Sequence, residues 1–463
     1  MTKSTGIRAY RKGQRLATAG DHATAILPFD RALSENPRLS DALVDKSVAL
    51  GELGRPQDAI EVLRRAIEIS PDDAIAHYNL GLFLSDTGDH TAAAIALMRS
   101  RELDPDDADT HQSLAHALER LGDTATAVAA YRAAIALAPS NLPILLDLAW
   151  LLSDNHEQDE ALRYAETAVS LAPNDARAHY TLGTLLRRAE RYAEAVPKFL
   201  RTLDLDPNYS EAHNNLGLTY SDLGQPADAV PILRMGLEIE GRDPQLEVNL
   251  ADALAELGQH EEAKTIFVRV AGGYPNDAWV QWQFGYFLIE QELYEEAIPV
   301  FQLALALDPY DIEAMRNLGI AYDHNERFAE AEKCYLAALE TDPHDPHVLN
   351  SLGVSYSWSG RESESIACYR RAITEDPKLG IARYNVGIRL KEIGDIQGAL
   401  TEFNTAVDLG FDDEDLYYNR GCIYDDLGRF DLALEDWRTT VAKYPGGETA
   451  SLAQEAIDSI VVF

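Results

Sequence analysis

The chain has 463 residues, 46% of them hydrophobic, and a formal net charge of −37. Acidic residues outnumber basic ones by 77 to 40, which argues against binding nucleic acid through a basic surface. No run approaches 18 apolar residues and residues 1–6 contain no apolar signal core, so we expect no membrane span and a cytoplasmic location.

The acidity has two interpretations. It could be a surface selected for a basic partner, or it could be a proteome-wide habit of a halophilic or high-GC organism, in which aspartate is frequent and lysine is rare. Asp outnumbers Glu by 41 to 36, and Arg outnumbers Lys by 31 to 9. Net charge bears on solubility and association and not on fold, so both interpretations stay open.

A 34-residue period begins after an amino-terminal extension, residues 1–5, and runs through residues 6–447 without insertion or deletion. Its thirteen copies start at residues 6, 40, 74, 108, 142, 176, 210, 244, 278, 312, 346, 380 and 414. A period of this length indicates a solenoid. In the remaining residues, 448–463, Leu452, Ala456 and Ile460 recur at four-residue steps and predict a capping helix with an apolar tail. We expect no appended domain.

Three places in each copy specify its local structure. The eighth place is always small, the twentieth is Ala in twelve copies and Ser365 in the other, and the thirty-second is Pro in eleven. Small residues allow two helices to pack closely, and Pro ends a helix because it lacks an N–H. Gly241 and Phe411 replace the Pro, which predicts looser turns after the seventh and twelfth copies.

Large apolar residues occupy places 4, 7 and 11 of a first helix and place 24 of a second, as the copy starting at residue 312 illustrates: Met315, Leu318, Gly319, Tyr322, Ala331, Tyr335, Ala338 and Pro343. This pattern resembles the tetratricopeptide repeat (TPR) family, with the usual Trp replaced by residues such as His77, His179 and His213. The resemblance implies an all-α, right-handed α-solenoid, or superhelix, of thirteen helix-turn-helix repeats. It also implies that a second stripe on each first helix lines a concave groove.

The sixth place of this second stripe carries a periodic ladder of amides: Asn79, Asn215, Asn249, Gln283, Asn317, Asn385 and Asn419. An amide side chain has a donor and an acceptor, so a row of them can bond the backbone of an extended peptide. The ladder resembles that in the TPR superhelix of O-linked N-acetylglucosamine transferases. The alternative is that each amide bonds the neighbouring repeat.

Aromatic side chains share the same stripe: Trp150, Tyr180, Trp279, Trp282, Tyr286, Trp358, Tyr384 and Tyr418. Aromatic residues often anchor partners, because they bury a large area at low entropic cost. They could instead pack between neighbouring first helices. Trp279, Trp282 and Tyr286 form the densest group and the best single anchor candidate.

Charged residues at the end of the first helices complete the candidate groove. The thirteenth place is mostly acidic, as at Asp222, Glu256 and Glu290, and would steer a basic segment. Arg187 and Arg188 belong to a local basic island in the sixth copy, which could hold an acidic group. Pairing with nearby carboxylates of the same chain is the alternative.

These features predict a non-enzymatic adaptor or scaffold that binds a basic or disordered protein segment in its groove. No phosphate loop, hydrolase motif or zinc motif is present in the sequence, and we expect no cofactor, metal, nucleic acid or membrane partner. Two alternatives remain: a structural or regulatory subunit that binds folded partners through its outer face, and a substrate-recruiting partner of a separately encoded enzyme. The pattern does not predict the oligomeric state.

Overall fold

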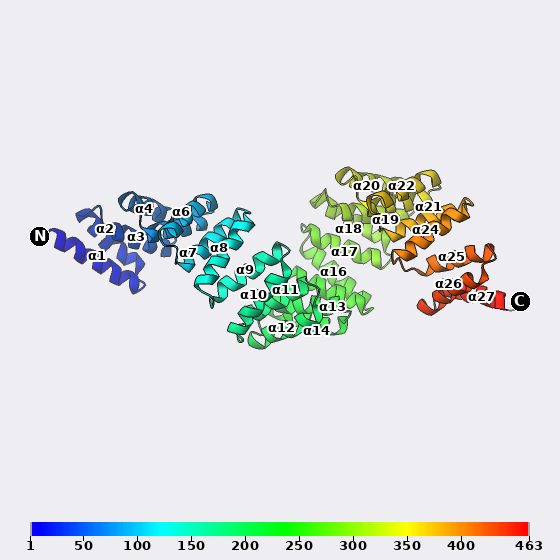
Figure 1. Ribbon diagram of the computed structural model, residues 1–463, viewed down its shortest axis with the longest axis horizontal. Helices are drawn as coiled ribbons and strands as arrows, with labels where there is room; N and C mark the ends of the chain where they lie inside the picture. Colours follow the sequence, from blue (N-terminus) through cyan, green and yellow to red (C-terminus); the bar gives the residue numbers. More distant parts are fainter. Residues whose placement is uncertain (1, 462–463) are drawn as a thin grey trace. The chain divides into compact units, whose positions relative to one another are not determined.

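The computed structural model describes the backbone of residues 2–461 and the side chains of residues 6–460. Within this range the chain forms 27 helices and no strand. It divides into two compact units, one that ends at Gly241 and one that begins at Arg242. Helices α1–α14 belong to the first unit and α15–α27 to the second. Figure 1 shows the helices coloured along the sequence, from blue at the amino terminus to red at the carboxyl terminus.

Unit 1 consists of seven helix pairs, each joined by a short turn. The helices are α1 (Thr2–Thr18), α2 (His22–Glu35), α3 (Ser40–Glu52), α4 (Pro56–Ile69), α5 (Ala74–Asp86), α6 (His90–Leu103), α7 (Ala108–Arg120), α8 (Thr124–Leu137), α9 (Leu142–Asp154), α10 (Gln158–Leu171), α11 (Ala176–Arg188), α12 (Tyr192–Leu205), α13 (Ser210–Asp222) and α14 (Pro226–Glu240). Helix α1 begins at Thr2, so residues 2–5 are part of the first helix.

Unit 2 consists of six further pairs and one terminal helix. Its helices are α15 (Pro244–Glu256), α16 (His260–Gly273), α17 (Ala278–Glu290), α18 (Tyr294–Leu307), α19 (Ile312–His324), α20 (Phe328–Thr341), α21 (Pro346–Trp358), α22 (Glu362–Glu375), α23 (Gly380–Glu392), α24 (Ile396–Asp408), α25 (Glu414–Asp426), α26 (Phe430–Lys443) and α27 (Glu448–Val461). From α3 to α25 every first helix starts 34 residues after the previous one. The architecture is therefore an all-α solenoid of helix pairs.

Where the eighth place is glycine, its small size is explained by the ring or branched side chain that lies against it. A Cβ added to Gly319 would lie 2.6 Å from the ring of Tyr335, sixteen residues later in the same pair. The same relationship joins Gly285 to Phe301 and Gly421 to Trp437. Because these side chains are almost completely buried, the eighth place has no room for a larger residue.

Part of the acidic excess serves to cap helices. The Asp243 carboxylate accepts a hydrogen bond from the Leu246 N–H at 2.8 Å, which satisfies one of the unpaired donors at the start of α15. Eight aspartates cap first helices in this way and four cap second helices: Asp73, Asp107, Asp175, Asp243, Asp277, Asp311, Asp345 and Asp413, and Asp21, Asp89, Asp123 and Asp395. Twelve of the aspartates therefore have a local structural role as helix caps.

The histidines at the fourth place stabilise the turns between copies. The Nε2 atom of His179 lies 3.0 Å from the carbonyl oxygen of Pro173, and His77, His111 and His213 make the equivalent bond to Pro71, Pro105 and Pro207. A carbonyl can only accept, so each bond requires the proton on Nε2. At the place where the repeat pattern usually has Trp, these side chains form a hydrogen bond to the preceding copy.

The two turns that lack the usual Pro differ from each other. Gly241 has a positive φ of 80°, is the C-cap of α14 and is the last residue of unit 1. Phe411 lies inside unit 2, and its side chain packs against Gly380 and, at a ring distance of 5.8 Å, Tyr384. An aromatic side chain therefore holds the second turn in place of the Pro.

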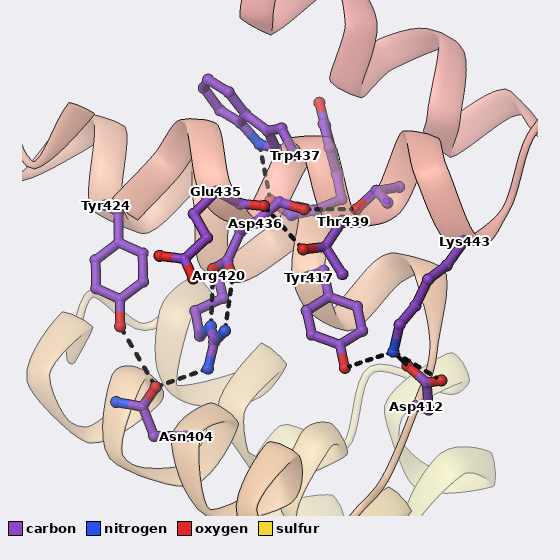
Figure 2. A network of polar contacts seen from close by, with 12 residues as sticks. Asn404, Asp412, Tyr417, Arg420, Tyr424, Glu435, Asp436, Trp437, Thr439 and Lys443 are labelled. Carbon is purple, nitrogen blue, oxygen red and sulfur yellow. Dashed lines mark hydrogen bonds and ion pairs between the residues drawn. The ribbon is translucent and has the colours of Figure 1, made fainter. Parts of the chain in front are cut away.

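A buried ion pair joins the last helix pairs of unit 2. Arg420 on α25 donates two hydrogen bonds to Asp436 on α26, at 2.8 and 2.6 Å, and a third to Asn404 on α24 (Figure 2). Asp436 is only 4% exposed. Lys443 binds Asp412 at 2.8 Å in the same region. These contacts tie three helices together immediately before the terminal helix.

Helix α27 covers the end of the solenoid by packing on α26 and α25. The side chains that it buries are Ala450, Ala453 and Ile457, whereas Leu452 is 41% exposed. Ala456 and Ile460 pack at the margin of the same cluster. The buried stripe is thus displaced by one residue from the predicted one, and the end of the apolar tail, residues 462–463, lies outside the described residues.

Candidate binding face of the first helices

The candidate site is the face formed by places 2, 5, 6, 9 and 13 of the first helices, which we call the first-helix face. Residues three, four and seven apart share one side of an α-helix, so these places lie together on each helix. Neighbouring first helices contact each other directly within a unit, as α11 and α13 do in unit 1 and α19 and α21 in unit 2. Each unit therefore carries a continuous stripe of these side chains.

Several amides of the ladder bond the preceding repeat. Asn215 Nδ2 donates to the phenol oxygen of Tyr180 at 3.1 Å and to the hydroxyl of Thr184 at 3.3 Å. Asn385 Nδ2 donates to Asn350 Oδ1 at 3.0 Å. In both cases a residue at the sixth place bonds the fifth place of the copy before it, thirty-five residues earlier.

The same bond recurs where the sixth place is not Asn. Tyr10 donates to Asp45 at 2.9 Å, and Gln112 donates to Asp147 at 3.1 Å. Asn419 continues the pattern with a longer contact, from its Nδ2 to the phenol oxygen of Tyr384. Lys391 donates to the side-chain oxygen of Asn419 at 2.9 Å. This series of bonds between copies is the alternative role considered for the ladder, and it applies in both units.

The rest of the ladder is less uniform. Asn317 is 3% exposed, and its Nδ2 has no acceptor among the described residues. Asn79 and Gln283 are half-buried, and Gln283 lines a cavity. Asn249 has a partner within the chain. A row of identical amides facing solvent is therefore not what the structure contains.

The aromatic residues fall into a packed group and an exposed group. Tyr180 stacks on Tyr209 at 4.8 Å, and Tyr384 packs on Phe403 at 5.8 Å. The guanidinium of Arg188 lies 4.9 Å from the ring centre of Trp150. These rings help to hold neighbouring elements together. Tyr418 is half-buried, as Trp150, Tyr180 and Tyr384 are.

In contrast, Trp279, Tyr286 and Trp358 are 40%, 40% and 50% exposed. All three belong to unit 2, on α17 and α21. Trp282 is half-buried and stacks parallel to Tyr286 at 5.3 Å, and its indole N–H has no acceptor among the described side chains. The exposed aromatic surface of the first-helix face is therefore concentrated in one unit.

Two cavities open on this face of unit 2. The first, which we call the acidic cavity, has a volume of about 520 Å³ and is lined by Asp252, Glu256, Trp282, Gln283, Tyr286 and Glu290, among others. The second, the apolar cavity, has a volume of about 200 Å³ and is lined by Ile320, Asp323, His324, Tyr335, Ser351, Val354 and Trp358. The acidic cavity lies between α15 and α17, and the apolar cavity involves α19, α20 and α21.

The two cavities differ in charge. Burial raises the pKa of Asp252 to about 7, and the nearby carboxylates of Glu290 and Glu256 add to the shift. Burial also raises the pKa of Asp323 to about 6, but the hydroxyls of Tyr335 and Ser355 donate to its carboxylate at 2.8 and 2.6 Å. The acidic cavity thus presents a cluster of like charges, whereas the one carboxylate of the apolar cavity is bound within the protein.

The charged residues proposed from the sequence are largely paired. Arg187 forms an ion pair with Asp222 at 2.9 Å, and Arg188 forms one with Asp154 at 2.5 Å. The basic island is therefore neutralised in part by its own chain. Glu256 and Glu290 line the acidic cavity.

Sequence reasoning missed Asp252 and, apart from Trp358, the residues that line the apolar cavity. Asp252 occupies the ninth place, where aromatic and aliphatic residues predominate, so a lone acidic residue there was the available signal. Ile320 and Val354 occupy the same place two and three copies later and read as ordinary apolar positions. Only the packing of the copies shows that they border a cavity.

Neither a metal site nor a membrane span is found in the described part of the chain. No three His, Cys, Asp or Glu side chains between residues 6 and 460 come together as metal ligands would. Among the helices of the structure, none combines the length and apolar character needed to cross a bilayer. Cys334, Cys368 and Cys422 are free and half-buried, and burial raises the pKa of each thiol.

Comparison with solved structures identifies similar solenoids. Yeast Tom70 matches with a TM-score of 0.50 and 17% identity, over 91% of this chain and 96% of that chain. The APC/C hetero-tetramer Cut9–Hcn1 matches with a TM-score of 0.43 and 14% identity, over 96% of this chain and 95% of that chain. At this identity the likeness to Tom70 shows the fold alone. No curated protein matches the chain.

Family models described as tetratricopeptide repeat match most of the chain. The matched residues are 44–108, 108–151, 146–210, 198–230, 222–281, 288–353, 346–379 and 414–437. They agree with the 34-residue period, with the small eighth place and with the helix pairs of both units. The chain belongs to the tetratricopeptide repeat family.

Proposed function

We propose that the chain is a non-enzymatic protein-interaction adaptor, which holds an extended segment of a partner protein along the first-helix face of unit 2. The observation that carries this proposal is a group of half-exposed aromatic side chains on one face, Trp279, Tyr286 and Trp358. Tyr286 and Trp358 each line one of the two cavities of that face. Large aromatic residues that remain exposed beside a cavity are typical of binding surfaces.

The apolar area on this face supplies a large part of the free energy that a useful affinity requires. Burying a half-exposed aromatic side chain removes about 100 Å² from water, which contributes about 2.5 kcal/mol. Three such side chains supply about 7 kcal/mol, and micromolar binding needs about 8 kcal/mol net. Since ordering an extended segment costs several kcal/mol, polar or charged contacts must supply the difference. The carboxylates of the acidic cavity are placed to do so.

The exposed apolar residues outside this face do not favour a second site. Leu27, Ile95 and Tyr310 are 76%, 65% and 76% exposed, but they come from separate elements. Isolated exposed apolar residues are normal on protein surfaces. The first-helix face of unit 2 is therefore the preferred candidate.

A display library of random 16-residue peptides, selected on the full-length chain, tests the proposal. We expect peptides to be enriched on the wild-type chain and on the control variant Leu27→Ala/Ile95→Ala/Tyr310→Ala, which removes three even more exposed apolar side chains elsewhere. The variant Trp279→Ala/Tyr286→Ala/Trp358→Ala should lose this enrichment while its circular dichroism spectrum stays unchanged. Equal enrichment on both variants would contradict the proposal.

A further inference from the structure

The acidic cavity has the composition of a receptor for a basic side chain. Its carboxylates come from two helices, Asp252 from α15 and Glu290 from α17, and the stacked rings of Trp282 and Tyr286 form one wall. Neither Asp252 nor Glu290 forms an ion pair with any described residue. The charge of the nearby Arg316 acts to lower the pKa of Tyr286, but the Arg316 guanidinium forms an ion pair with Glu313.

A guanidinium group fits this lining better than an ammonium group. It is planar, it can stack on an aromatic face, and it can donate two parallel hydrogen bonds to a carboxylate. The acidic cavity offers both an indole–phenol wall and carboxylates on two sides. The positive charge of a bound arginine would also offset the repulsion between the carboxylates of Asp252 and Glu290.

The apolar cavity has the size and lining for one apolar side chain. Its volume of about 200 Å³ is smaller than that of typical small-molecule sites. Ile320 and Val354 form its aliphatic wall, and Trp358, which is 50% exposed, stands at its side. His324 stacks on Tyr294 at 3.9 Å and meets Trp358 edge-on at 5.1 Å, and burial lowers the His324 pKa, which favours the neutral ring.

The repeat fixes the separation of the two cavities. Asp252 and Ile320 occupy the ninth place of copies that are two repeats apart, and Glu290 and Trp358 occupy the thirteenth place with the same separation. Packed helices lie about 10 Å apart, so two repeats correspond to about 20 Å. An extended chain rises about 3.3 Å per residue, so this distance spans about six residues.

We infer that unit 2 recognises a bipartite segment, in which an arginine enters the acidic cavity and a branched or aromatic apolar residue about six positions away enters the apolar cavity. This inference rests on the proposed function and specifies the chemistry of the partner. Charge complementarity selects the basic residue, and the volume and lining of the second cavity select the apolar one.

The same peptide-display library, selected separately on three variants of the full-length chain, tests this inference. Asp252→Asn/Glu290→Gln removes two charges from the acidic cavity, and Trp358→Ser removes one side of the apolar cavity. Glu52→Gln/Asp86→Asn is the matched control, because it removes two acidic groups from the thirteenth place of unit 1. Thermal unfolding of each variant shows whether it is folded.

On the wild-type chain and the control we expect enriched peptides to carry an arginine and a large apolar residue about six positions apart. The acidic-cavity variant should lose only the preference for arginine, and Trp358→Ser should lose only the preference for the apolar residue. A synthetic peptide from the wild-type selection should bind the acidic-cavity variant at least tenfold more weakly.

Two results would overturn the inference, and they are distinguishable. If peptides are enriched without this pair of residues, or if both cavity variants change the preferences equally, the bipartite recognition is wrong and the adaptor proposal stands. If no form of the chain enriches any peptide, the adaptor proposal fails and the inference fails with it.

Discussion

Asn215 donates a hydrogen bond from its side-chain amide to the phenol oxygen of Tyr180 at 3.1 Å, across the junction between α11 and α13. Its Nδ2 also donates to Thr184, so both amide protons are used within the chain. The carbonyl half of the side chain has no such bond, and it could still accept from a peptide N–H. A ladder amide can therefore hold two repeats together and keep one hydrogen-bonding atom for a partner.

A double-mutant cycle on Asn215 and Tyr180 tests the structural half of this role. Asn215→Ala and Tyr180→Phe should each lower the free energy of unfolding by about 1 kcal/mol, because each removes a hydrogen bond between repeats. The double variant should lose less than the sum by about 0.5 kcal/mol. Urea unfolding followed by circular dichroism measures these changes.

Asn79→Ala provides the control for this cycle. Asn79 occupies the same place in its copy, but it makes no side-chain hydrogen bond among the described residues. Its replacement should change the unfolding free energy by less than about 0.5 kcal/mol. Strict additivity of Asn215→Ala and Tyr180→Phe would show that the two side chains do not interact in solution.

Gly319→Ala should lower the unfolding free energy by about 1–3 kcal/mol, because the new Cβ would lie 2.6 Å from the ring of Tyr335. That ring is 1% exposed and its hydroxyl is held by Asp323, so it cannot move aside easily. Gly272→Ala is the matched control: this glycine is also helical, but nothing lies within 4 Å of its Cβ position. We expect it to gain about 0.4–1 kcal/mol. Thermal unfolding of both variants decides the matter, and similar melting temperatures would contradict the packing argument.

The sequence predicts contacts within one copy better than contacts between neighbouring copies. The small eighth place predicted close packing because Gly319 and Tyr335 belong to one copy, where the helix-turn-helix geometry is fixed. The ladder left two roles open because the bond from Asn215 to Tyr180 depends on how adjacent copies are offset. The period identifies the fifth and sixth places of each copy. It does not predict which of these side chains bonds the neighbouring copy.

The acidic cavity illustrates the same limit. Its aromatic wall was predicted as an anchor from the density of Trp282 and Tyr286, whereas Asp252, one copy earlier, did not belong to any periodic row. A single polar residue at an apolar place gives no pattern that can be read along the chain. Similarly, the register of α27 could not be predicted, because residues 448–463 lie outside the 34-residue period that identifies the buried side of the other helices.

Arg420→Met should lower the unfolding free energy by about 3 kcal/mol or more, because it leaves the buried carboxylate of Asp436 without its counter-ion. The double variant Arg420→Met/Asp436→Leu should recover most of that loss, since apolar side chains can replace a buried ion pair at little cost. Chemical denaturation of the two variants and the wild type measures the recovery. A double variant as unstable as Arg420→Met would show that the remaining contacts of the network, such as that of Asn404, carry its effect.

The charge of the acidic cavity predicts a pH-dependent stability. Burial raises the pKa of Asp252 in the folded state to about 7 from its ordinary value of 3.8, so the folded chain binds this proton more tightly than the unfolded chain does. Its contribution to stability therefore decreases as the pH rises from about 4 to about 7, and the full penalty remains above that range. Asp252→Asn removes the titrating group and should raise the unfolding free energy at pH 8 by about 4 kcal/mol, since a shift of about three pKa units corresponds to that energy.

Measuring the difference between Asp252→Asn and the wild type as a function of pH isolates this group, because the other carboxylates titrate in both proteins. The difference should be smallest near pH 4 and reach its plateau above pH 7. Glu290→Gln should make the rise smaller, since Glu290 is one of the charges that raise the Asp252 pKa. A difference that is constant with pH would mean that Asp252 ionises normally. If the rise is seen and the same variant also binds arginine peptides more weakly, this carboxylate lowers stability in the free chain and serves to bind a cation.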